Sequence, residues 1–179
     1  MACSVYGAQY LLEGLYNARA GDYALELMTA THDRSWYNMI EIGSTISLEA
    51  WDMKYKPNAD WNHAWGAVPA NMIPRGLWGI KPASPGFAKV AVKPQMGNLK
   101  QASIIHPTTL GPIKGSYQKV TNRLTRYQIE LPGNMIGEFM LDFSDNQVIS
   151  LNGEMVNPAF GSIRLNPGPN QIEIQVNSF

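Results

Sequence analysis

The sequence predicts an α+β chain of two domains, in which helices come first and an antiparallel β-sandwich follows. The spacing of apolar residues changes near residue 80 from a helical period to the alternation that is typical of strands. All five Trp residues lie before that point, and all five Phe residues lie after it. The segment 81–86 reads Lys-Pro-Ala-Ser-Pro-Gly and suits a linker, so we expect domains at 1–81 and 87–179.

About four helices are expected in the first domain. The first is indicated by apolar residues that recur at the spacing of one helix face. These residues are Tyr6, Tyr10, Leu11, Leu15 and Ala18. A second helix is expected after Gly21-Asp22, and the short link between the two predicts an antiparallel pair.

The third and fourth helices would carry the polar part of this domain. Ser44 or Thr45 could cap the third helix, on which Glu49 and Asp52 would share one face because they are three residues apart. The fourth helix is expected after Asn62 and would be bent or interrupted by two prolines.

Apolar and polar residues alternate in four segments of the second domain, as they do in half-buried strands. The segments are 89–93, 126–131, 138–143 and 171–176. Asn152-Gly153 is a strong signal for a two-residue hairpin, and further turns are expected at 132–134 and 167–170. Short strands at this spacing indicate an antiparallel sandwich.

Composition excludes several classes of partner. The 14 basic and 14 acidic side chains cancel, so neither nucleic acid nor a membrane surface is an expected partner. Cys3 is the only cysteine, and no Cys/His cluster has zinc-site spacing, so we expect no metal and no cofactor. Apolar runs are too short for a membrane span. Phosphate-loop, serine-hydrolase and zinc-protease motifs are absent from the sequence.

Carboxylates, indoles and amides are concentrated in residues 36–66. A glycosidase needs these groups: acids to exchange protons at the glycosidic bond, flat apolar faces to stack on the sugar, and polar side chains for its hydroxyls. The composition of this stretch therefore favours a sugar site.

Each candidate residue also has a purely structural interpretation. From its spacing alone, Glu49 resembles an ordinary solvated carboxylate, and Asp52 suits a cap or a local ion pair. Trp36 and Trp65 suit the helix core, because indoles dominate such packing. His63 suits a core or capping role as well as it suits a ligand contact.

Four motifs occur in a fixed order along the chain. They are the runs 33–40 (Asp-Arg-Ser-Trp-Tyr-Asn-Met-Ile), 43–52 (Gly-Ser-Thr-Ile-Ser-Leu-Glu-Ala-Trp-Asp), 61–64 (Trp-Asn-His-Ala) and 79–87, which begins Gly-Ile-Lys-Pro and ends Pro-Gly-Phe. Together they resemble the C-terminal part of bacterial α-L-rhamnosidases, and the resemblance extends over the whole chain. It implies that residues 1–81 are the last helices of an (α/α)6 barrel, a six-hairpin glycosidase fold, and that residues 87–179 form its closing β-sandwich.

The resemblance also implies roles for individual residues. In that family the Glu of the second motif is the general base that activates water in an inverting hydrolysis, and it matches Glu49. Asn62 and His63 would bind sugar hydroxyls, and Trp51 and Trp61 would form walls of the pocket. The implied substrate is a glycoside or polysaccharide with terminal α-L-rhamnose.

The chain departs from the family pattern in two ways. Leu48 stands where an aromatic residue often precedes the Glu, and Ile46 stands where a second Thr is usual, which implies an altered sugar pocket. An (α/α)6 barrel also needs many more than about four helices, and the family's general acid would lie upstream. We therefore expect a C-terminal piece whose partner is the missing upstream helices and which is inactive alone.

Two other interpretations remain open. The chain could be a non-catalytic carbohydrate-binding or interaction module, in which the sandwich binds its ligand. Such a sandwich usually exposes Trp or Tyr, whereas residues 81–179 contain no Trp and only Tyr117 and Tyr127, which weakens this interpretation. The chain could also be a structural piece that completes a split barrel, which co-purification of a partner with the upstream helices would reveal.

Overall fold

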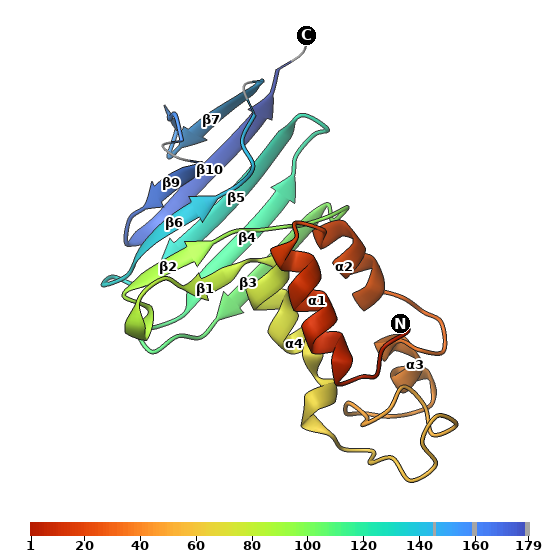
Figure 1. Cartoon of the computed structure of the whole chain (residues 1–179). Coiled ribbons are helices and arrows are strands. Elements are labelled where there is room, and N and C mark those ends of the chain that lie inside the picture. The colour runs from red at the N-terminus through yellow and green to blue at the C-terminus, as the bar shows by residue number, and fades with distance from the viewer. Residues whose placement is uncertain (145, 159–160, 178–179) are drawn as a thin grey trace. The chain divides into compact units, whose positions relative to one another are not determined.

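The computed structural model describes residues 1–144, 146–158 and 161–177. Phe160 and Phe179, counted above, lie outside the described residues. Helices precede two β-sheets along the chain, so the α+β class is confirmed (Figure 1). No helix in the described part of the chain is both long and apolar enough to cross a membrane.

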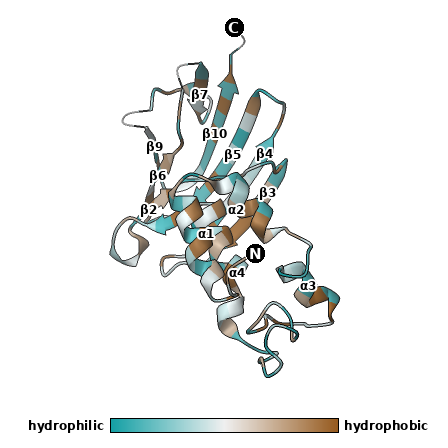
Figure 2. Cartoon of the chain, turned by 45° about the vertical axis from the view of Figure 1, so that its right-hand side comes forward, coloured by the Kyte–Doolittle hydropathy of each residue, from teal (hydrophilic) through white to brown (hydrophobic). Residues whose placement is uncertain are grey.

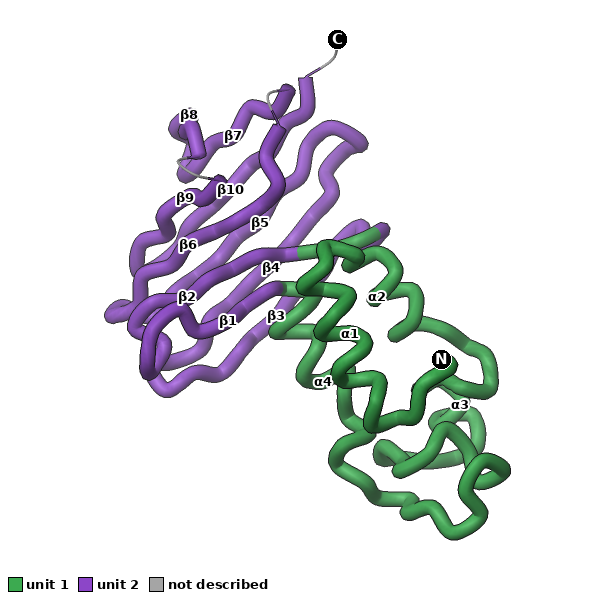
Figure 3. Tube along the Cα trace, viewed as in Figure 1, with its two compact units in different colours: residues 1–78, 95–97 green, residues 79–94, 98–179 purple. Residues whose placement is uncertain are grey.

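The chain separates into two compact units (Figure 3). Unit 1 comprises residues 1–78 and 95–97, and unit 2 comprises residues 79–94 and 98–179. The division falls shortly before residue 81 because Ile80–Pro82 is a strand, β1, which pairs with β2 (Lys89–Val92) of unit 2. The expected linker therefore begins inside a sheet. The assignment of 1–81 to a barrel and of 87–179 to a closing domain stays a prediction.

Three helices and one short π-helix form the packed part of unit 1. They are α1 (Gly7–Asn17), α2 (Gly21–Met28), α4 (Val68–Met72) and the π-helix Ile73–Leu77. Gly76 lies so close to the Tyr16 ring that a Cβ atom there would be 2.2 Å from it. A larger residue at position 76 would therefore separate α1 from the π-helix.

The buried face of α1 differs from the expected one. Ala8, Leu12 and Tyr16 are buried, whereas Tyr10 of the expected stripe is 61% exposed. The helix carries apolar residues on both faces, so its periodicity alone did not determine which face packs in this structure. The predicted α1–α2 contact is present.

The predicted third helix is wrong in position. The helix α3 spans Trp36–Glu41, and the Ser35 hydroxyl caps it by accepting the Asn38 N–H at 3.1 Å. Gly43 then adopts a left-handed conformation with φ +90°, which ends the helix. Residues 44–62, including Glu49, have no regular secondary structure. The predicted fourth helix is present as a 3-10 turn at Ala64–Gly66 followed by α4.

Unit 2 contains two sheets. One has the order β1-β2-β6-β9, with β6 at Ile136–Met140 and β9 at Ser162–Leu165. The other has the order β3-β4-β5-β10-β7-β8. Its strands are Gln101–His106, Ile113–Lys119, Leu124–Leu131, Gly168–Val176, Gln147–Leu151 and Glu154–Met155 in that order. All described pairings are antiparallel except that of β2 with β6, which is parallel.

Alternation along the strands places apolar side chains on the inner faces of the sheets. Buried residues alternate with exposed residues in β5 and mainly with half-buried residues in β10. The banded colouring of these strands shows the matching alternation of hydrophobic and hydrophilic residues (Figure 2). Phe139 on β6 is fully buried and contacts the ring of Tyr127. Asn152 and Gly153 both have positive φ between β7 and β8, which confirms the predicted hairpin. The expected turn at 167–170 is shorter, because β10 already begins at Gly168.

We expect unit 2 to resist proteolysis and unit 1 to be cleaved. Unit 2 has a buried core between its own sheets, whereas unit 1 combines a long irregular segment with several exposed aromatic side chains. Limited proteolysis followed by mass spectrometry of the surviving fragments measures this difference. A stable piece covering 1–78, together with rapid loss of 98–179, would show that the expectation is wrong.

Candidate active site

Buried neighbours hold the Glu49 segment in place without a helix. Leu48 and Trp51, on either side of Glu49, belong to an apolar cluster with the N-terminal residues of the chain. The Trp51 indole N–H donates to the Cys3 carbonyl oxygen at 2.7 Å. Gly66 approaches this segment so closely that a Cβ atom would lie 2.5 Å from the Leu48 carbonyl oxygen. The backbone around Glu49 is therefore held on two sides.

A second segment pairs with the first and brings distant residues together. The Glu49 N–H donates to the Asp60 carbonyl oxygen at 3.1 Å, and the His63 N–H donates to the Ser47 carbonyl oxygen at 2.9 Å. The Ser47 hydroxyl donates to the His63 carbonyl oxygen, also at 2.9 Å. These bonds place Glu49 beside Asp60 and His63, although residues 50–59 separate the two segments in sequence.

The Glu49 carboxylate is held in its ionised form. Its Oε1 accepts a hydrogen bond from the Lys56 ammonium, and its Oε2 accepts the Asp60 N–H at 3.1 Å. The Lys56 hydrogen bond and then the Asp60 N–H lower the pKa of Glu49 below its usual value. Only 13% of the side chain is exposed. A carboxylate that stays ionised at neutral pH can accept a proton from water.

His63 lies close to the Asp60 carboxylate and to the Trp65 ring. Its Nδ1 is 3.5 Å from an Asp60 carboxylate oxygen, and its ring centroid is 4.0 Å from that of Trp65. Trp65 in turn contacts the Tyr6 ring at 5.0 Å. The imidazole thus has a carboxylate and an indole as direct neighbours.

Glu49, Asp60 and His63 each offer one ligand atom, and these atoms lie within 4.8 Å of one another. Such a trio could hold a metal ion. The Lys56 ammonium in contact with Glu49 places a positive charge beside the same atoms, which disfavours a cation there.

A cavity of about 560 Å³ lies in unit 1 against the Glu49 segment. Its size falls in the range of small-molecule pockets. Polar or aromatic side chains make up much of its lining, which includes Tyr6, Arg34, Glu49, Tyr55, Lys56 and Trp65. Among the described lining residues, Glu49 is the only carboxylate.

The structure brings together some of the expected site residues. Glu49 and Trp51 line the cavity, although Trp51 is only 4% exposed and its indole N–H is already bonded within the core. His63 lies beside Glu49. Asn62 and Trp61 are exposed, and neither these two residues nor His63 are among the described residues that line the cavity.

Three other residues at this site were not predicted from the sequence. Trp65, expected in the core, is 42% exposed and lines the cavity. Lys56 and Asp60 contact Glu49 through an irregular loop, and no periodic pattern in the sequence indicates those contacts. Asp52 pairs locally, as expected, because its Oδ1 accepts the Lys54 N–H at 3.1 Å.

Two known protein domains match this chain, one in each half. Residues 1–77 match the bacterial alpha-L-rhamnosidase 6 hairpin glycosidase domain, and residues 79–156 match the bacterial alpha-L-rhamnosidase C-terminal domain. The chain belongs to the bacterial α-L-rhamnosidase family. The two matches meet where the chain divides into its two units.

The chain is also similar to individual proteins, in sequence to one relative and in fold to solved structures. An alpha-L-rhamnosidase of Alteromonas sp. (strain LOR) is 27% identical over 144 residues, which cover 75% of this rhamnosidase-family chain and 15% of the relative. Solved structures with a similar fold include the alpha-L-rhamnosidase from Dictyoglumus thermophilum, with a TM-score of 0.82, 21% identity, and coverage of 96% of this chain and 21% of that one. The Streptomyces avermitilis alpha-L-rhamnosidase complexed with L-rhamnose has a TM-score of 0.79, 21% identity, and coverages of 94% and 17%. The chain therefore spans a small part of the length of its relatives.

Proposed function

We propose that this chain contributes the general-base side of the active site to an inverting glycoside hydrolase that acts on terminal α-L-rhamnosides. One observation carries the proposal: an ionised carboxylate, Glu49, lines a cavity and lies next to His63. Family membership supports rhamnosides as the substrate class.

The geometry suggests how the chemistry is divided. Glu49 removes a proton from the attacking water, and His63 with the Trp65 ring positions the sugar. An inverting enzyme needs a second carboxyl group roughly 6.5–9.5 Å from the base, with the water between them. Because Glu49 is the only carboxylate among the described lining residues, we assign the general acid to barrel helices outside this chain.

We expect the chain alone to hydrolyse no aryl α-L-rhamnoside at a measurable rate. A missing general acid costs about 10²- to 10⁴-fold in rate, and the missing barrel helices also remove contacts that position the sugar. Release of the aryl group, followed by its absorbance, measures the rate. The control is a rhamnosidase in which this segment is part of a whole barrel. Turnover by the chain alone, abolished by Glu49→Gln, would contradict the proposed division of the site.

His63→Ala is expected to raise KM roughly tenfold in a whole rhamnosidase that contains this segment, which corresponds to the loss of one good hydrogen bond to the sugar. Steady-state kinetics with the aryl rhamnoside measure this change. His106→Ala is a matched control, because His106 lies on β3 of unit 2. A correctly folded His63→Ala enzyme with an unchanged KM would remove His63 from the sugar site.

A further inference from the structure

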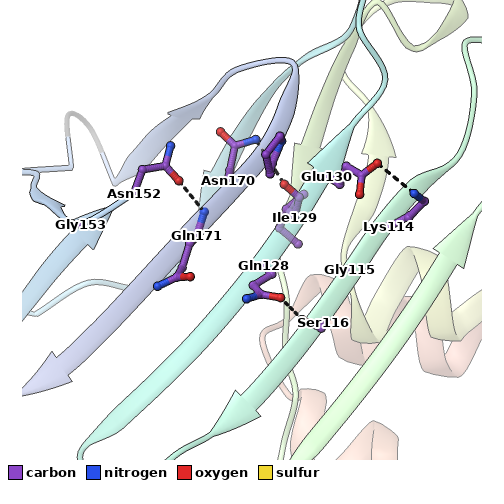
Figure 4. A pocket seen from close by; sticks show the side chains of 11 residues that line it. Lys114, Gly115, Ser116, Gln128, Ile129, Glu130, Asn152, Gly153, Asn170 and Gln171 are labelled. Atoms are coloured by element: carbon purple, nitrogen blue, oxygen red, sulfur yellow. Dashed lines mark hydrogen bonds and ion pairs between the residues drawn. The ribbon is translucent and has the colours of Figure 1, made fainter.

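A second cavity lies on unit 2 and shares no lining residue with the cavity at Glu49. It has a volume of about 880 Å³ and lies over the six-stranded sheet, lined by β4, β5, β10 and the turn between β7 and β8 (Figure 4). On β5 the buried residues Tyr127, Ile129 and Leu131 alternate with the exposed residues Gln128 and Glu130. The side chains that line the cavity therefore come mainly from the outward face of the sheet.

Two amide side chains of the lining lie on neighbouring strands. Gln128 on β5 and Gln171 on β10 are direct neighbours in the strand register. The Gln128 amide oxygen accepts the Ser116 hydroxyl at 3.3 Å, and the Gln171 amide nitrogen donates to Glu173 at 3.2 Å. Within the described residues, the Gln128 amide nitrogen and the Gln171 amide oxygen have no such bond. A donor and an acceptor are thus presented next to each other.

The charges around the cavity are paired. Lys114 donates to Glu130 at 2.9 Å across β4 and β5, and Arg126 bonds Glu173 at 2.7 Å nearby. Each cation has an anion as its direct partner, so the cavity presents little net charge to a ligand. This balance favours a neutral ligand over a phosphate or a polyanion.

Two hydrogen bonds between Asn152 and Gln171 fix one wall of the cavity. The Asn152 N–H donates to the Gln171 carbonyl oxygen at 2.8 Å, and the Gln171 N–H donates to Asn152 Oδ1 at 2.8 Å. The hairpin turn is therefore bonded to β10 without any ligand. Pro169 at the other side offers an exposed apolar surface. Little reorganisation is needed for a ligand to enter.

We propose that this cavity is a binding site for a neutral, hydroxyl-rich oligosaccharide. A sugar hydroxyl both donates and accepts, which matches the neighbouring Gln128 and Gln171 amides, and its C–H face can rest on Pro169. The site lies on the face of the sheet, so it does not offer the unpaired edge that an added peptide strand requires. It lacks an aromatic platform among its described lining residues, so binding is weak, with a Kd of about 1 mM. The site is independent of the role proposed for Glu49.

Titration of the ¹⁵N-labelled full chain with a linear α-L-rhamno-oligosaccharide tests the proposal. The side-chain amide resonances of Gln128 and Gln171 are expected to shift and to saturate with a Kd of about 1 mM. Gln171→Ala removes one hydrogen-bonding partner and is expected to raise Kd about three- to tenfold. Gln118→Ala, at an exposed position of the adjacent strand β4 outside the cavity lining, is the matched control and should leave Kd unchanged.

Three results would overturn the proposal. The first is the absence of shifts at sugar concentrations about ten times the expected Kd. The second is a shift of the Lys114 resonances that an acidic oligosaccharide causes and a neutral one does not, which would indicate an anion site. The third is a set of shifts confined to the surroundings of Glu49. This result would agree with the proposed active site and would show that the cavity on unit 2 does not bind the sugar. Backbone amide spectra of each variant show whether the sheet is still folded.

Discussion

Glu49→Gln is expected to lower kcat by roughly 10²- to 10⁴-fold in a rhamnosidase that contains this segment within a whole barrel. The amide is nearly isosteric with the carboxylate, but it cannot take a proton from water. Because the change removes proton transfer and keeps the shape of the pocket, KM should change little. Steady-state hydrolysis of an aryl α-L-rhamnoside measures both parameters.

The structure supplies a matched control for this experiment. Asp52 belongs to the same irregular segment, but its carboxylate bonds Asn38 and the Lys54 N–H and does not line the cavity. Asp52→Asn should therefore leave kcat within about threefold of the unmodified enzyme, since it keeps the local shape. A near-normal kcat in the Glu49→Gln enzyme would show that Glu49 is not the general base.

The largest expected effect on stability follows from Phe139→Ala in unit 2. Phe139 is fully buried on β6, and its ring centroid lies 5.0 Å from that of Tyr127. Truncation to Ala leaves a cavity in the core of the sandwich, which should lower the free energy of unfolding of this unit by about 3–5 kcal/mol.

Denaturant unfolding of the full chain can separate the two units. All five Trp residues lie in unit 1, so their fluorescence follows that unit, whereas far-UV circular dichroism also follows the sheets of unit 2. The control is Met155→Ala, since Met155 is 78% exposed and should change stability by less than about 0.5 kcal/mol. An unchanged sheet transition in Phe139→Ala would show that this residue is not a core residue in solution.

Periodicity predicted unit 2 better than it predicted unit 1. In β5 and β10 the alternating residues identify the buried face directly, because a strand has only two faces. In α1 the apolar residues lie on more than one face, and contacts with α2 and α4 decide which face is buried. The expected helix around Glu49 is absent because tertiary contacts again decide the local structure. Burial of Leu48 and Trp51 holds that segment without helical hydrogen bonds.

The sequence by itself determined the α+β class, the change from helices to strands near residue 80, the Asn152-Gly153 hairpin and the family motif that contains Glu49. Each of these depends on residues that are close together along the chain. Only the tertiary structure decided that Lys56 and Asp60 bond Glu49, that Trp65 lines the cavity, and that paired amides face outward from the sheet. These contacts arise when irregular loops or separate strands pack together, and local propensity carries no information about such packing.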